Sequence, residues 1–303
     1  MASIREIKRR IKSVKNISQV TRAMQMVAAS RMRRAQERAL SSRPYAAKAW
    51  EILTHLAAQG GNVSQLHPLL TSRAQINNVA IILITADKGL AGAYNSNVIR
   101  KTSQFMRNND QEQASLITVG RKGRDFMVRF QRKVVAEFAD LPPLPSSLDI
   151  APITRLALDG FLSEEYDEVY LAYTDFINTL VQEPTVRLLL PIRPGDIESK
   201  VMSEYLGSGS PAATTEYLYE PSPAVLLDSL LPRFTELQIY QAVLEARASE
   251  ESARMVAMRN ATDNAKELIS DLTLTYNKVR QDAITKEMLD IAGGAEALAQ
   301  ASA

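Results

Sequence analysis

Few residues in this 303-residue sequence are of a type and spacing that could carry out catalysis. It has no cysteine, which excludes disulfides, thiolate metal sites and cysteine nucleophiles. The two histidines, His55 and His67, have no pattern of carboxylates near them, so neither is indicated as a metal ligand or general base. No nucleophile-elbow motif is present. We therefore expect no catalytic residue, no cofactor and no metal.

Two glycine-containing loops are candidate phosphate sites. The loop 87–92 (DKGLAG) follows a predicted strand and precedes a predicted helix, a place where backbone amides can bind phosphate. It lacks the Rossmann and Walker glycine patterns, so a tight strand-to-helix turn is the better interpretation. For 120–124 (GRKGR) we expect a solvated turn. Four carboxylates near the C-terminus are expected on a solvated helix face: Glu245, Glu250, Glu251 and Glu267.

The longest element that the sequence predicts is a helix near the C-terminus. Residues 233–292 contain no Gly or Pro, which predicts one uninterrupted helix of roughly 90 Å. Side chains at alternating three- and four-residue spacing form the seam of a coiled coil. That seam comprises Glu251, Met255, Met258, Thr262, Ala265, Ile269, Leu272, Tyr276, Val279 and Ala283. We expect Gly293 and Gly294 to end the helix.

The N-terminus predicts a second rod. Residues 1–43 also lack Gly and Pro, and Ser3 with Glu6 forms a capping-box pattern. Pro44 should kink or interrupt the helix, which resumes over 45–58. The predicted seam comprises Ile4, Ile7, Ile11, Val14, Ile17, Val20, Met24 and Val27.

Between the rods, short β-branched runs alternate with helical stretches, which is typical of an α/β layer domain. Strands are predicted at 78–87, 115–120, 133–135, 168–173 and 185–190, and helices at 95–109, 124–130 and 150–162. The expected fold is therefore α/β plus long helices: an antiparallel two-helix coiled coil with an inserted Rossmann-like α/β domain. The predicted ranges are 1–58 for the N-terminal helix, 59–74 for a linker, 75–205 for the α/β domain, 206–221 for a linker and 222–303 for the C-terminal helix.

The charges of the two rods are opposite. Residues 1–58 carry thirteen basic and three acidic groups, and residues 222–303 carry eight basic and twelve acidic groups. Such rods should pair within one chain and leave an excess of positive charge for an acidic surface. Nucleic acid, an anionic membrane and an acidic protein ring would each provide one, and a self-dimerising rod is a further alternative. The longest apolar run, Val79–Ile84, is too short to span a bilayer.

Five segments, in order, resemble the γ subunit of the F-type ATP synthase. They are Ile4–Gln36, Thr85–Asn95 (TADKGLAGAYN), Tyr217–Pro221 (YLYEP), Ser252–Asn264 (SARMVAMRNATDN) and Tyr276–Thr285 (YNKVRQDAIT). A generic coiled coil would share the periodicity of this family but not these strings.

The resemblance implies a central shaft in a proton-translocating complex, present in one copy. Its partners would be a ring of three α and three β subunits, the ε subunit and the membrane c-ring, with no nucleic acid and no membrane insertion. Catalysis would take place on β, while this chain would transmit rotation and regulate ATPase activity and proton flow. It would lie peripherally on the cytoplasmic face of a bacterial plasma membrane. The implied partner contacts are Met24, Arg254, Arg280, Gln281, Thr285, Glu287 and Asp290.

Overall fold

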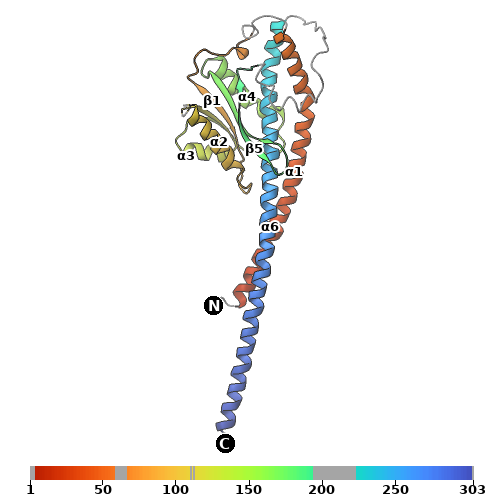
Figure 1. Cartoon of the computed structure of the whole chain (residues 1–303), viewed down its shortest axis with the longest axis vertical. Helices are drawn as coiled ribbons and strands as arrows, with labels where there is room; N and C mark the ends of the chain where they lie inside the picture. Colours follow the sequence, from red (N-terminus) through yellow and green to blue (C-terminus); the bar gives the residue numbers. More distant parts are fainter. Residues whose placement is uncertain (1–3, 59–66, 110, 112, 194–222, 302–303) are drawn as a thin grey trace. The chain divides into compact units, whose positions relative to one another are not determined.

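The computed structural model describes residues 4–58, 67–109, 111, 113–193 and 223–301. Two long helices, α1 (Ile4–Ala58) and α6 (Pro223–Ala301), flank an α/β domain in the sequence (Figure 1). The chain forms two compact units, one of residues 1–27 with 255–303 and one of residues 28–254. The predicted linker 206–221 and the Tyr217–Pro221 segment lie outside the described residues, and the predicted domain ranges stay a prediction.

The first unit is a pair of helices held along a narrow seam. On α6 the buried positions are Met258, Thr262 and Ala265, and the partly buried ones continue at the predicted spacing to Ala283. A hydrogen bond of 2.7 Å joins the hydroxyls of Thr21 and Thr262. In the second unit Arg31 of α1 meets Glu251 of α6, so the sequence order of the partners is reversed and the helices are antiparallel, as predicted.

The predicted seam of α1 was correct in its first half and at Met24, and wrong at the other three positions. Ile7 is buried, and Ile4, Ile11 and Val14 are partly buried. Three further predicted positions are exposed: Ile17 (53%), Val20 (58%) and Val27 (50%). The seam instead keeps the strict alternation of three and four through Ser18, Thr21, Gln25 and Ala28. Residues spaced repeatedly by three wind around the helix and so point away from the partner helix. Whether a residue is buried in this seam therefore depends more on its position in the heptad than on its hydrophobicity.

The second unit contains a five-stranded sheet with the order β3-β2-β1-β4-β5. β1 pairs in parallel with β2 and β4, β2 pairs in parallel with β3, and β5 is an antiparallel edge strand. The predicted Rossmann-like domain is confirmed. The strands are β1 (Val79–Ile84), β2 (Ser115–Val119), β3 (Val134–Phe138), β4 (Glu168–Phe176) and β5 (Gln182–Leu190). The shorter helices are α2 (Tyr94–Asn108), α3 (Arg121–Arg129), α4 (Ser147–Leu162) and the 3-10 helix η2 (Pro68–Leu70).

Both faces of this sheet are covered. All six residues of β1 are buried, as expected for a central parallel strand. One face packs with residues of α4 and α6, including Phe161, Leu231 and Val243. The other packs with α2 and α3, including Val98 and Met127. The first part of α6 therefore belongs to the core of the second unit.

Two predicted helix breaks are not present. α1 continues through Pro44, and Ala49 and Ile52 beyond it pack on the sheet core, which offsets the lost backbone hydrogen bond. α6 continues through Gly293 to Ala301. A helical Gly costs only about 1 kcal/mol, and the sequence after Gly294 (AEALAQA) consists of strong helix formers.

Candidate functional site

The loop after β1 lies where doubly wound sheets usually bind ligands, at the carboxyl ends of the strands. It is the predicted tight turn. The Ala86 N–H donates to Oδ1 of Asn95 (2.9 Å), and the Ala86 carbonyl accepts from the Lys122 N–H (3.1 Å). Oδ1 of Asp87 accepts from the Arg121 N–H (3.2 Å). The loop is therefore fastened to the starts of α2 and α3.

The second glycine loop is a close backbone contact, and the predicted solvated turn was wrong. Gly120 is buried with φ of 93°, and a Cβ there would lie 2.2 Å from the Thr85 carbonyl oxygen. The Thr85 hydroxyl accepts from the Gly123 N–H (2.9 Å) and donates to the Val119 carbonyl (3.1 Å). The Gly123 amide is thus used within the protein and is not available to a phosphate.

His67 has a structural role. Its Nδ1 accepts from the Leu69 N–H (3.1 Å), which caps η2, and its Nε2 lies 3.3 Å from Asp228 at the start of α6. Burial lowers the pKa of His67, while the Asp228 carboxylate acts in the opposite direction. His55 lies in α1. Among the described residues, no group of three or more acidic or histidine side chains could hold a metal ion.

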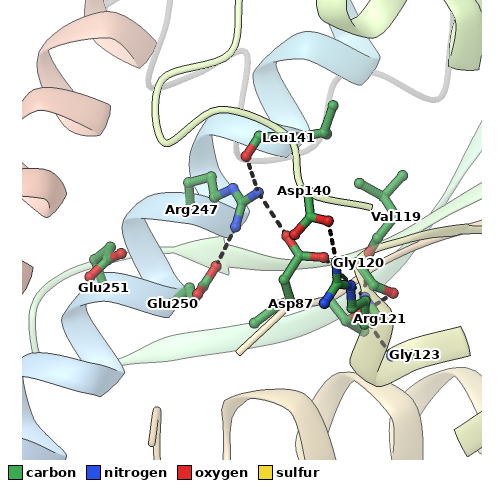
Figure 2. A network of polar contacts seen from close by, with 12 residues as sticks. Asp87, Val119, Gly120, Arg121, Gly123, Asp140, Leu141, Arg247, Glu250 and Glu251 are labelled. Carbon is green, nitrogen blue, oxygen red and sulfur yellow. Dashed lines mark hydrogen bonds and ion pairs between the residues drawn. The ribbon is translucent and has the colours of Figure 1, made fainter. Parts of the chain in front are cut away.

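The main polar feature of the second unit is a charge cluster where α6 passes the sheet. Arg247 donates to Oε2 of Glu250 (2.9 Å) and to the Leu141 carbonyl (3.3 Å), and it lies 3.6 Å from Oδ2 of Asp87 (Figure 2). Arg254 binds both Glu250 (2.6 Å) and Glu251 (2.8 Å). Glu251 lies 3.7 Å from Arg31 of α1. The charge cluster is Arg31, Asp87, Arg247, Glu250, Glu251 and Arg254.

Most of these charges are removed from water. The side chains of Glu250, Arg254 and Arg247 are 5%, 10% and 15% exposed, and only Arg31 lies largely in solvent. Burial alone would lower the pKa of both Arg247 and Arg254, but the Glu250 carboxylate more than offsets it and raises the pKa of each. Three cations face three anions, so the cluster is neutral as a whole. Such a group is stable only while its members stay paired.

Next to the charge cluster, α6 also packs against the loop after β1. Tyr94 is buried with Ala86 and Ala91 of the β1 loop, and Ala253 of α6 packs against them. Burial raises the pKa of Tyr94, and the nearby Glu250 carboxylate adds to the shift. A residue of α6 therefore packs on the loop after β1, at the edge of the sheet where doubly wound folds usually bind ligands.

The predicted partner-contact residues fall into two groups. Five are exposed on α6 in the first unit: Arg280, Gln281, Thr285, Glu287 and Asp290. Met24 is half-buried on α1 of the same unit. Arg254 belongs to the second unit and is buried against two carboxylates of its own helix.

The prediction of a solvated carboxylate face was correct only for Glu267. Glu250 and Glu251 are buried in the charge cluster, and Glu245 is largely shielded from solvent beside Asp175 and Arg187. The roles of Arg247 and Asp87 were missed. One signal was available: Arg247 and Arg254 lie three or four residues from Glu250 and Glu251, the spacing at which opposite charges meet on one helix face.

The chain thus combines a pair of long helices with a Rossmann-like sheet, and comparisons with known proteins show which family has this combination. Residues 3–298 match the protein family described as ATP synthase. The ATP synthase gamma chains of Dehalococcoides mccartyi and Roseiflexus castenholzii are each 50% identical to this chain, over 299 and 302 residues. Each alignment covers 99% of this chain and 100% of the relative.

Solved structures of ATP synthases also resemble this chain. The central stalk of the Tetrahymena thermophila mitochondrial ATP synthase is 25% identical with a TM-score of 0.58, covering 80% of this chain and 99% of that one. A second solved structure is a chain of the Euglena gracilis mitochondrial ATP synthase, which is 19% identical to this chain with a TM-score of 0.65. The match covers 97% of this chain and 94% of that one, and it shows that the two share a fold. This chain belongs to the ATP synthase gamma chain family.

The expected resemblance is thereby confirmed, and with it the role of a non-catalytic subunit in the central stalk of the rotor. The matched relatives in bacteria are subunits of a membrane-associated complex. Within the part of this chain that the structure describes, no helix combines the length and the apolar character needed to cross a bilayer.

Proposed function

We propose that this chain carries torque along the central stalk, with its two-helix rod enclosed by a ring of three α and three β subunits. The observation that carries this proposal is apolar surface on the rod. Ile17, Val20 and Val27 lie along one side of α1 and are 53%, 58% and 50% exposed. Apolar side chains gathered on an exposed surface mark a contact with another protein. An enclosing ring would cover them.

The apolar side chains at the C-terminal end of α6 are even more exposed. Its seam toward α1 is partly buried as far as Ala283, and the residues described beyond it are exposed. Met288, Leu289 and Ile291 there are 66%, 66% and 73% exposed. A helix end with flexible and branched apolar side chains suits a bearing that slides in an apolar sleeve.

Polar residues share this end of the helix. Arg280, Ile284, Glu287 and Ile291 are spaced by four, three and four residues, so they lie along one face, and Gln281, Thr285 and Met288 lie along a neighbouring face. We infer that Arg280, Gln281, Thr285, Glu287 and Asp290 contact loops of the β subunits, and that Met24 faces the β subunits from α1. Exposed polar contacts are worth about 0 to 1 kcal/mol each, so single substitutions should weaken coupling without preventing assembly.

Arg254 has a different part in this proposal. Because both of its carboxylate partners belong to its own helix, we infer that it stabilises α6 within the second unit and affects the contact with β only indirectly. The remaining proposed partners are the ε subunit and the c-ring, with one copy of this chain in each complex. The complex would translocate protons at the cytoplasmic face of a bacterial plasma membrane, and this chain would regulate its ATPase activity.

The proposal is tested by co-expression with α and β subunits of the same organism, followed by native mass determination and an ATPase assay. A particle with three α, three β and one copy of this chain that hydrolyses ATP is expected. A chain that purifies alone or as a dimer, while α and β assemble without it, would overturn the proposal.

A pair of variants sharpens the test. The double variant Ile284→Ser/Leu289→Ser removes apolar surface from the end of α6, and it should reduce the share of particles that retain this chain. Leu148→Ser removes an 84% exposed leucine from α4 in the other unit and should leave that share unchanged.

A further inference from the structure

Arg247 lies where α6 meets the loops of the sheet. Its guanidinium donates to the Leu141 carbonyl in the connection between β3 and α4, and it lies 3.6 Å from Asp87 after β1. Asp87 in turn accepts from the first backbone N–H of α3 (Figure 2). One side chain of α6 thus contacts two loops of the sheet and, through Asp87, a third element.

The contacts continue from the sheet side to both long helices. Glu250 accepts from Arg247 through one carboxylate oxygen and from Arg254 through the other. Arg254 also binds Glu251, which faces Arg31 of α1. The charge cluster is therefore a continuous series of alternating charges from the β1 loop through α6 to α1, all within the second unit.

Such a series resists a specific motion. A single apolar contact has no preferred direction, so for a small rotation of α6 the packed core supplies less angular restraint per contact than a directional hydrogen bond or ion pair does. A planar guanidinium holds its acceptors at fixed distance and angle, and in a site with little water these contacts are stronger than at a surface. Rotation of α6 against the sheet would separate Arg247 from Asp87 and from the Leu141 carbonyl.

We propose that Arg247 is a positioning residue that fixes the angle between the shaft helix α6 and the α/β domain, so that torque passes through the charge cluster. This inference rests on the proposed function, because it requires that the shaft carries torque. It assigns the stiffness of the joint to Arg247, Asp87 and Glu250. The apolar core around Leu231 and Val243 holds the helix against the sheet, and the directional contacts of Arg247 add to its resistance to rotation.

The test measures angular stiffness in the assembled complex. The chain has no cysteine, so Arg129→Cys on the exposed side of α3 provides a single attachment point for a rotation probe. With the α and β ring immobilised and hydrolysis stopped, the variance of the probe angle reports the compliance between ring and α/β domain. Arg247→Met should increase this variance about two-fold or more, because it keeps the side-chain volume but removes the directional contacts.

The ATPase rate of the Arg247→Met complex should stay near that of the parent, since β carries out catalysis. Arg247→Lys retains the charge without the planar fork and should give an intermediate variance. Arg124→Met is the matched control: it removes an arginine that pairs with Asp125 and Glu137 on the outside of the same domain, and the variance should not change.

An unchanged variance in an assembled Arg247→Met complex would overturn the inference. If that variant does not assemble, Asp87→Asn is used instead, since it removes one charge with almost no change in shape. An unchanged variance of the probe angle in the Asp87→Asn complex would also overturn the inference. Failure of the parent complex to assemble or to turn its probe with ATP would instead contradict the proposed function.

Discussion

The two units of this chain are built on different principles. In the second unit, a central strand is buried at all six positions and both faces of the sheet are covered by helices. In the first unit, burial is confined to a narrow seam, and large apolar residues such as Ile17 and Ile291 remain exposed. The second unit therefore has an enclosed core, to which α6 contributes, whereas the rod buries only a seam and has little core of its own.

This difference predicts where stability resides in the isolated chain. Ile82→Ala removes a fully buried side chain from β1 and should lower the free energy of unfolding of the second unit by about 4 kcal/mol, through lost burial and the cavity left behind. Chemical denaturation measures the loss. A change below about 1 kcal/mol would show that the sheet core is looser than its burial indicates.

Glu245 offers a test based on pH. Burial, with a contribution from Asp175, raises the pKa of Glu245 from 4.5 to about 7, so ionisation costs stability in the folded state only. This cost is absent below about pH 4.5, grows as the pH rises through 7, and then stays constant. Glu245→Gln should therefore stabilise the protein by up to about 3 kcal/mol at pH 8 and leave it unchanged at pH 4.

Thermal unfolding at both pH values measures this difference. Glu267→Gln, on the exposed face of the rod, is the matched control and should show no such dependence on pH. A gain from Glu245→Gln that is equal at pH 4 and pH 8 would exclude ionisation of Glu245 as the cause.

The hydroxyl pair in the rod should contribute less. Thr262→Val removes the hydroxyl that Thr21 contacts across a partly buried seam, while Thr21 keeps its bond to the Ser18 carbonyl, and this should cost about 1 kcal/mol. The double variant Thr21→Val/Thr262→Val should recover most of that loss, because both polar groups are then absent. A double-mutant cycle from denaturation curves gives the coupling, and purely additive effects would indicate that the two hydroxyls do not interact.

The smallest effect is expected for the exposed stripe of α1. Ile17→Ala should change the stability of the isolated chain by less than about 0.5 kcal/mol, since the side chain is already half in solvent. In the complex it should reduce retention of this chain. A large loss of stability in the isolated chain would show that Ile17 packs within the chain.

The sequence predicted those elements whose structure is decided by a local pattern of residues. The β-branched run at Val79–Ile84 and the seam of α6 are strong local signals, and both predictions were correct. The α1 prediction failed where polar and small seam residues, such as Ser18 and Gln25, replace apolar ones, because the partner helix selects the face. The direction of β5 was not predicted.

The charge cluster could not be predicted in the same way. Glu250 and Glu251 were predicted on a solvated face because charged side chains are rarely buried. Their burial is decided by Asp87 and the Leu141 carbonyl, which are more than a hundred residues away in the sequence. Only the folded sheet brings those groups to the helix.

The central claim, that this chain is a rotating shaft, is tested most directly by watching it turn. The α and β ring is fixed to a surface, and a probe is attached to the α/β domain through Arg129→Cys. We predict unidirectional rotation on addition of ATP, with a rate that follows ATP hydrolysis. A probe that stays at one angle while the same complex hydrolyses ATP would contradict the claim.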